Sequence, residues 1–458
     1  MKLILMKYGA NTSRSNDYTV CYKTGKDKGY MELGIMQREW PHKRMRYCIK
    51  LNPSKQEIRS LPKHTELSFI PMDAVGEDGS LDLSTTRPIE DVENGYTFFR
   101  NDDVAIAKIT PCFENGKGCI FRNLVQNYGF GTTELTVMRP TQLVPAYLYY
   151  LTISHRFRTT GIGLMQGSAG QKRVPDDYIR DYKIGLPSEA EQQAIASFLD
   201  RETARIDALI QKKERMIELL KEKRIALITQ AVTKGLDPNA PMKDSGIEWL
   251  GEVPEHWEVK RIKHVATRIQ TGCTPPTSKE QYYEDGTIQW FGPSSFTGDL
   301  YLSDPVKIIN ESSVTDGVAR LFEEGSVMMV GIGATIGKIA QIKIPSSCNQ
   351  QITVVTLKRS ECDPDYYTYL LKTMETTIRG IAPSATLAIF DQGKIGSLSV
   401  LKPPLFEQVQ VAEFLSDKLS VLEHMMSTIS GSIRLLREYR SSLINAAVTG
   451  KIDLREAL

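Results

Sequence analysis

Apolar side chains recur every three or four residues over two long stretches of the chain, and each stretch predicts a single helix. The first stretch runs from about Glu189 to Thr233, and no glycine or proline follows until Gly235. Ser188 can cap its amino end, with Glu191 as the partner of a capping box. The apolar seams are Ile195, Leu199, Ile206, Leu209, Met216, Leu220 and Leu227 in the first helix, and Val411, Leu415, Leu422, Met425, Ile429, Leu436 and Leu443 in the second.

Each predicted helix is too long and too one-sided to be stable alone. A helix of about 45 residues is about 65 Å long, and a single apolar seam must be buried against a partner. The simplest partner is the other helix of the same chain, in an antiparallel coiled coil that would place the intervening domains at opposite ends. The alternative is that each helix packs only on its own domain.

The chain also repeats itself. Ala231–Asp237 recurs as Ala447–Asp453, 216 residues later, and Trp40 matches Trp257 at an offset of 217, each with Lys-Arg three and four residues on. The sequences between these matches differ strongly, so shared and variable blocks alternate. The predicted domains are 1–186 and 238–402 as variable blocks, and 187–237 and 403–458 as long-helix blocks.

The variable blocks have the pattern of a mixed α/β fold. Runs rich in β-branched residues predict strands at 103–109, 135–138, 326–330 and 352–357, and short helices are expected after Pro145 and Pro364.

Composition and charge narrow the class of protein. The 458 residues are 41% hydrophobic and 24% charged, which is typical of a soluble protein of several domains. The net charge is only +2, but the first 50 residues contain 11 Lys or Arg against 4 Asp or Glu. A phosphate binder needs local basic surface rather than a basic total. The seven cysteines form no C-x-x-C pair and no apolar run could span a bilayer, so we expect reduced thiols in a cytoplasmic protein.

Motifs for catalysis are missing. Gly331–Lys338 resembles a phosphate-binding loop, but Ile332 and Ile339 stand where that loop needs Gly and Ser or Thr. Asp363–Tyr366 lacks the second proline of an adenine-methyltransferase motif, and the six histidines have no metal-ligand spacing. We therefore expect a chain without catalytic residues, metal or cofactor of its own, and disfavour a fused restriction enzyme or methyltransferase.

Several stretches match one known family. They are Lys243–Arg261, Gln166–Val174, Leu186–Asp200 and the twice-present Ala-Val-Thr segment. With these stretches and its two-fold order, the chain resembles the specificity subunit of a type I restriction–modification system over essentially its full length. The resemblance implies two α/β target-recognition domains joined by two long helices, with a pseudo-two-fold internal repeat.

The resemblance also implies a function. Each variable domain would bind one half of a bipartite, asymmetric site in double-stranded DNA, while the helices set the spacer and dock two methylation subunits. The methylation subunits would bring S-adenosylmethionine, and restriction subunits would bring ATP and Mg. The alternative is a coiled-coil scaffold or binding protein without sequence-specific DNA recognition.

Candidate DNA contacts are basic side chains for phosphates and amides or hydroxyls for base edges. Each could instead be a solvated surface residue or a structural cation. The phosphate candidates are Lys43, Arg44, Arg46, Lys172, Arg173, Lys260, Arg261 and Lys263, and the base candidates are Gln166, Ser168, Gln171, Gln350 and Gln351.

Overall fold

The computed structural model describes residues 5–6, 19–23, 30–33, 40–168, 170–247, 250–381 and 389–452. The chain divides into two compact units. Unit 1 comprises Met1–Lys213 and Gly431–Leu458, and unit 2 comprises Glu214–Ser430. Each unit therefore contains part of both long helices and one α/β block. The block boundaries given above stay a prediction.

Unit 1 contains two four-stranded sheets, with strand orders β10-β9-β12-β5 and β7-β6-β11-β8. Strand β9 is central and all four of its side chains are buried. The strands are β1 (Leu5–Met6), β2 (Thr19–Lys23), β3 (Tyr30–Leu33), β4 (His42–Arg44), β5 (Ile49–Leu51), β6 (Glu66–Ile70), β7 (Thr86–Pro88), β8 (Thr97–Arg100), β9 (Val104–Ala107), β10 (Gly118–Ile120), β11 (Tyr128–Gly131), β12 (Leu135–Pro140) and β13 (Lys183–Gly185).

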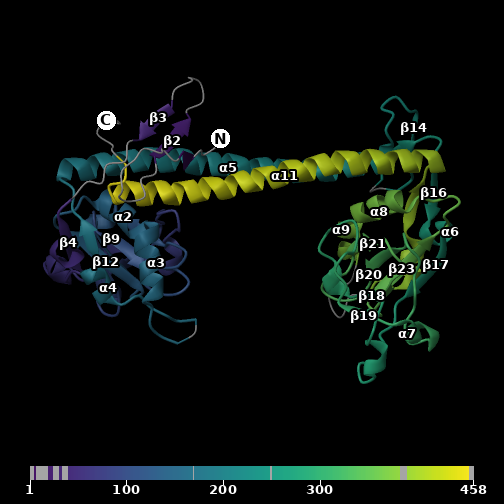
Figure 1. Ribbon diagram of the computed structural model, residues 1–458, viewed down its shortest axis with the longest axis horizontal. Coiled ribbons are helices and arrows are strands. Elements are labelled where there is room, and N and C mark those ends of the chain that lie inside the picture. Colours follow the sequence, from purple (N-terminus) through teal and green to yellow (C-terminus); the bar gives the residue numbers. More distant parts are fainter. Residues whose placement is uncertain are drawn as a thin grey trace, which may run out of the picture. The chain divides into compact units, whose positions relative to one another are not determined.

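Short helices complete unit 1, namely α1 (Ile89–Val92), α2 (Pro145–Ile153), α3 (His155–Gly163) and α4 (Asp176–Asp181) (Figure 1). Helix α2 begins at Pro145, as predicted, because proline at the first helical position loses no backbone hydrogen bond. The Tyr147 hydroxyl donates to the Val448 carbonyl oxygen at 3.2 Å, so α2 is anchored to the end of the second long helix.

Unit 2 has the same central arrangement. Its larger sheet has the order β17-β23-β20-β21, and a second sheet has the order β19-β18-β22. The strands are β14 (Met242–Asp244), β15 (Glu252–Pro254), β16 (Glu258–Arg261), β17 (Ala266–Thr271), β18 (Ile288–Phe291), β19 (Lys307–Ile309), β20 (Val327–Val330), β21 (Ile339–Gln341), β22 (Ser347–Cys348), β23 (Ile352–Leu357) and β24 (Ser399–Lys402). The short helices are α6 (Ile262–Val265), α7 (Glu311–Thr315), α8 (Pro364–Thr373), α9 (Glu375–Ile381) and α10 (Gln392–Ser397).

The predicted strands and short helices of the variable blocks are confirmed. The four strand predictions correspond to β9, β12, β20 and β23, and α8 begins at Pro364. The loop 331–338 connects the antiparallel neighbours β20 and β21, which agrees with its interpretation as a turn between strands. The internal repeat is thus present as two copies of one sheet topology.

The long helices are α5 (Glu189–Lys234) and α11 (Leu405–Val448). The predicted capping box is present, since Glu191 Oε2 accepts from the Ser188 backbone N–H at 3.0 Å. The helices pack together in each unit. In unit 1 Arg440 pairs with Asp207 at 2.9 Å, and in unit 2 Arg224 pairs with Glu423 at 3.3 Å.

Within unit 2 the helices run antiparallel. Arg224 lies beside Glu423, whereas further along α5 Val232 joins a core that includes Val411 near the start of α11. Most of the predicted seam is buried or half-buried. This applies to Ile195, Leu199, Ile206, Leu220, Leu227, Val411, Leu415, Leu422, Ile429, Leu436 and Leu443.

The seam prediction was wrong at three positions. Leu209, Met216 and Met425 are 39%, 51% and 45% exposed. The inward positions are the residues that follow them, for example Ile210, which is 8% exposed. Inward positions in a coiled coil alternate steps of three and four residues. The sequence pattern assigned a step of three residues after Ile206, whereas the structure has a step of four, to Ile210. Leu209 therefore lies on the flank of the helix.

Candidate nucleic acid interface

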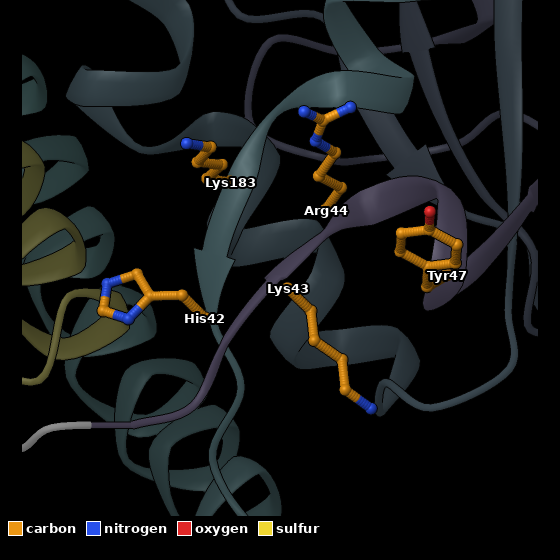
Figure 2. A pocket seen from close by; sticks show the side chains of 5 residues that line it. All are labelled: His42, Lys43, Arg44, Tyr47 and Lys183. Atoms are coloured by element: carbon orange, nitrogen blue, oxygen red, sulfur yellow. The ribbon is translucent and has the colours of Figure 1, made fainter.

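A basic pocket opens beside the paired strands β4 and β13 of unit 1. Its volume is about 570 Å³, and His42, Lys43, Arg44, Tyr47 and Lys183 line it. The antiparallel register places Lys183 directly opposite Arg44. Figure 2 shows these two side chains next to each other, whereas Lys43 points to the other side of its strand. We call this site the β4–β13 pocket.

The β4–β13 pocket keeps a surplus of positive charge. Arg44 pairs with Asp181 at 3.1 Å, and Arg46 pairs with the same carboxylate. Lys183 has no acidic partner among the described residues, whereas Lys43 donates to the side-chain oxygen of Gln142 at 3.0 Å on the other side of the strand. Several cations that share one carboxylate attract an anion such as a DNA phosphate.

Three residues of this pocket, His42, Tyr47 and Lys183, are not among the DNA contacts predicted from the sequence. Lys183 is exposed and reaches the pocket only through strand pairing with a distant segment. Tyr47 has 65% of its surface exposed, so its ring is available to a ligand. No local sequence signal distinguishes Lys183 from any other surface lysine, whereas Tyr47 lies three residues after Arg44 of the predicted Lys-Arg pair.

The corresponding strand pair in unit 2, β16 and β24, is more neutral. Lys260 lies 3.3 Å from Glu258, and Lys402 pairs with Glu361. The hydrogen bond from Lys402 lowers the pKa of Glu361. Arg261 and Lys263 are exposed, so these two predicted phosphate contacts remain accessible.

We call the segment that carries the predicted base contacts of unit 1 the recognition loop, and it is closed at its base. Gln166 and Arg173 exchange two backbone hydrogen bonds of 3.0 and 2.8 Å. The Arg173 guanidinium donates from Nε and Nη2 to Glu134 at 2.9 and 2.6 Å, and this contact lowers the pKa of Glu134. Arg173 therefore holds the loop in place and is only partly available to a phosphate. Gln166, Ser168, Gln171 and Lys172 are exposed on the loop.

The predicted base contacts of unit 2 line a smaller pocket of about 270 Å³. Gln350 and Gln351 are contributed by the segment before β23, and Thr271, Asp391 and Gln392 also line the pocket. We call this site the β20–β23 pocket. The structure thus places Gln350 and Gln351 at one pocket, and it places Lys260, Arg261 and Lys263 at a different part of unit 2, around β16 and α6.

The described part of the chain has few features that indicate other chemistry. There, no group of three or more His, Cys, Asp or Glu side chains is arranged to hold a metal. No described helix has the length and hydrophobicity required to cross a membrane. Burial raises the pKa of the Cys119 thiol to about 12, so this free cysteine is inert at neutral pH.

Comparison with known proteins decides the family. The model of the type I restriction modification DNA specificity domain matches residues 59–219 and 254–427, once in each half of the chain. The chain belongs to this family. The duplicated match agrees with the two copies of the sheet topology.

Individual relatives support this assignment. The Escherichia coli type I restriction enzyme EcoEI specificity subunit is 41% identical over 149 residues, which are 32% of this chain and 24% of that relative. The chain thus aligns with about a quarter of that relative's length. The putative type I restriction enzyme MjaX specificity subunit of Methanocaldococcus jannaschii is 21% identical over 82% of this chain and 85% of its own length.

A solved structure shares the fold. A chain from a structure described as the basis of complex assembly and conformational transition of the type I R-M system superposes with a TM-score of 0.68. It is 17% identical in sequence, and the match covers 90% of this chain and 98% of that chain. The architecture of two recognition domains with two packed long helices, predicted from the sequence, is confirmed.

Proposed function

We propose that this chain is the DNA specificity subunit of a type I restriction–modification complex and that each unit binds one half of a bipartite, asymmetric site. The observation that carries the proposal is the repeated frame. One sheet topology occurs twice, with the orders β10-β9-β12-β5 and β21-β20-β23-β17, but the exposed side chains around it differ. Two similar frames with different surface chemistry suit two different half-sites.

A separate reading subunit also suits the chemistry of methylation. An enzyme that methylates adenine at N6 extrudes the base from the duplex. Its pocket then holds one base and cannot contact a long sequence. Base edges in the major groove must be contacted elsewhere. We therefore propose that this chain supplies recognition and no catalytic residue.

The β4–β13 pocket supports phosphate binding by unit 1. Lys183 and Arg44 contact the DNA backbone in this proposal and fix the orientation of the duplex, while the loop 166–173 contacts base edges. Arg261 and Lys263 take the phosphate role in unit 2.

The exposed apolar residues of the long helices support docking of partner subunits. In unit 2, Met216 and Leu219 on α5 are 51% and 48% exposed, and Val421 and Met425 on α11 are 52% and 45% exposed. Large apolar side chains grouped on a surface mark interaction sites. We propose that methylation subunits cover them and bring S-adenosylmethionine. Restriction subunits complete the complex with ATP and Mg, and the assembly acts in the cytoplasm.

Mapping N6-methyladenine across host DNA, with and without this gene, tests the proposal. The expected result is a bipartite, asymmetric motif whose methylation disappears on deletion. Footprinting with the methylation subunit present must protect the same site. A scaffold without sequence recognition would protect none. Methyl transfer from S-adenosylmethionine by the purified chain alone would contradict a purely recognitional role.

A further inference from the structure

The two units share a backbone frame that continues beyond the sheets. In unit 1 it follows β9. The Lys108 N–H donates to the Glu134 carbonyl at 2.9 Å, the Lys108 carbonyl accepts from the Val174 N–H at 2.9 Å, and Ile109 forms an antiparallel bridge with Arg173. These contacts join the end of β9 to the start of β12 and to the recognition loop.

Unit 2 repeats each of these contacts after β20. The Gly331 N–H donates to the Gln351 carbonyl at 2.8 Å, the Gly331 carbonyl accepts from the Phe390 N–H at 2.8 Å, and Ile332 bridges Ile389. Equivalent positions in the two units can therefore be compared directly, although their sequences differ.

The side chains on this shared frame have different chemistry. In unit 1 the carboxylate of Glu134 is occupied by the Arg173 guanidinium. In unit 2 the equivalent pair is Gln351 and Ile389, which cannot form an ion pair. Gly331 has no side chain where unit 1 has Lys108. The β20–β23 pocket lies at this position, and its lining combines the amides of Gln350, Gln351 and Gln392 with the apolar side chains of Ile332, Ile389 and Phe390.

Hydrogen bonds within unit 2 orient the two amides of the pocket. The Gln350 side-chain oxygen accepts from the Thr274 hydroxyl at 2.5 Å, and the Gln351 side-chain oxygen accepts from Asn349 Nδ2 at 3.0 Å. Both oxygens are engaged, and neither amide NH₂ group has a protein acceptor among the described residues. The Asp391 carboxylate caps α10 by accepting from the Lys394 N–H at 2.9 Å. The pocket thus presents two amide NH₂ donors beside the Asp391 carboxylate.

We propose that Gln350 and Gln351 recognise a guanine in the half-site that unit 2 binds, an inference that rests on the proposed function. Guanine presents two acceptors, N7 and O6, in the major groove, whereas adenine presents one acceptor and the N6 donor. A glutamine usually pairs with adenine through both its oxygen and its nitrogen. Here each oxygen already accepts one hydrogen bond within unit 2, and the two NH₂ groups, which have no protein acceptor among the described residues, match the two acceptors of guanine.

The Gln350→Glu and Gln351→Glu variants test this inference in the full chain, expressed with its methylation subunits. Each replaces an NH₂ donor by a carboxylate acceptor, which suits cytosine N4 and opposes guanine. The expected result is a loss of roughly ten-fold or more in methylation of the guanine-containing site. We expect the variant complexes to prefer cytosine at that position and to recognise the other half of the motif unchanged. Gln281→Glu adds the same charge to an exposed position outside the pocket and must leave the motif intact.

Variants that only remove the donors keep the test decisive if the charged ones assemble poorly. Gln350→Ala and Gln351→Ala must relax the guanine position towards any base. Retained guanine selectivity in all of these variants, or a unit 2 half-site without guanine, overturns the inference and leaves the proposed function standing. Absence of any bipartite motif with the unaltered chain overturns the proposed function itself.

Discussion

Lys183 of the β4–β13 pocket allows a quantitative test of phosphate binding. It has no acidic partner among the described residues, so Lys183→Gln removes one charge without releasing a carboxylate. Each phosphate contact contributes about 0.9 to the slope of log affinity against log salt. Loss of one contact should therefore lower the slope by about 0.9. The affinity ratio between 50 and 200 mM salt should shrink by about 3.5-fold.

The assay is fluorescence anisotropy of the assembled methylation complex with duplexes that do or do not contain the motif, over a salt series. Lys183→Gln must weaken both duplexes equally, because a phosphate contact does not distinguish sequences. Lys402→Gln is the matched control, since Lys402 is already paired with Glu361 in unit 2, and its slope change must be smaller. An unaltered slope for Lys183→Gln, or an equal change in both variants, would refute the phosphate-binding role.

Three further predictions concern stability, spacing and assembly. Asp103→Ala should destabilise unit 1 by about 3 kcal/mol in urea unfolding, because the buried Arg139 loses the carboxylate that it contacts at 2.8 Å and keeps Glu57, which is more exposed, as an acidic partner; replacing Asp103 and Arg139 together by apolar residues should cost less. Inserting four residues near Lys213 adds about 6 Å of helix and should lengthen the spacer in the methylated motif by roughly 1–2 base pairs, and an unchanged spacer argues against a ruler. Met216→Glu and Met425→Glu should weaken binding of the methylation subunit at least about ten-fold in pull-down titrations, because burial of a charge is costly. The helix content measured by circular dichroism should stay unchanged. Normal binding would exclude these residues from the docking face.

The periodic spacing of apolar residues and the residues that begin helices were sufficient to predict these helices from the sequence. Helical spacing, the Ser188 capping box and the prolines at 145 and 364 act over a few residues, so they predict α5, α2 and α8 without knowledge of the fold. The repeat offsets likewise determined that one architecture occurs twice. Family and general role follow from the same local stretches.

The tertiary structure alone decided which faces and side chains meet. One residue of drift turns a helix face by about 100°, and only the packed partner shows that Ile210 rather than Leu209 faces inward. Lys183 joins Arg44 through strand pairing between segments far apart in the chain. The engagement of the Gln350 and Gln351 oxygens depends on Thr274 and Asn349 being within hydrogen-bond distance. The type of a residue indicates which ligands its side chain can bind. The neighbours of that side chain in space determine which of its donors and acceptors remain available to a ligand.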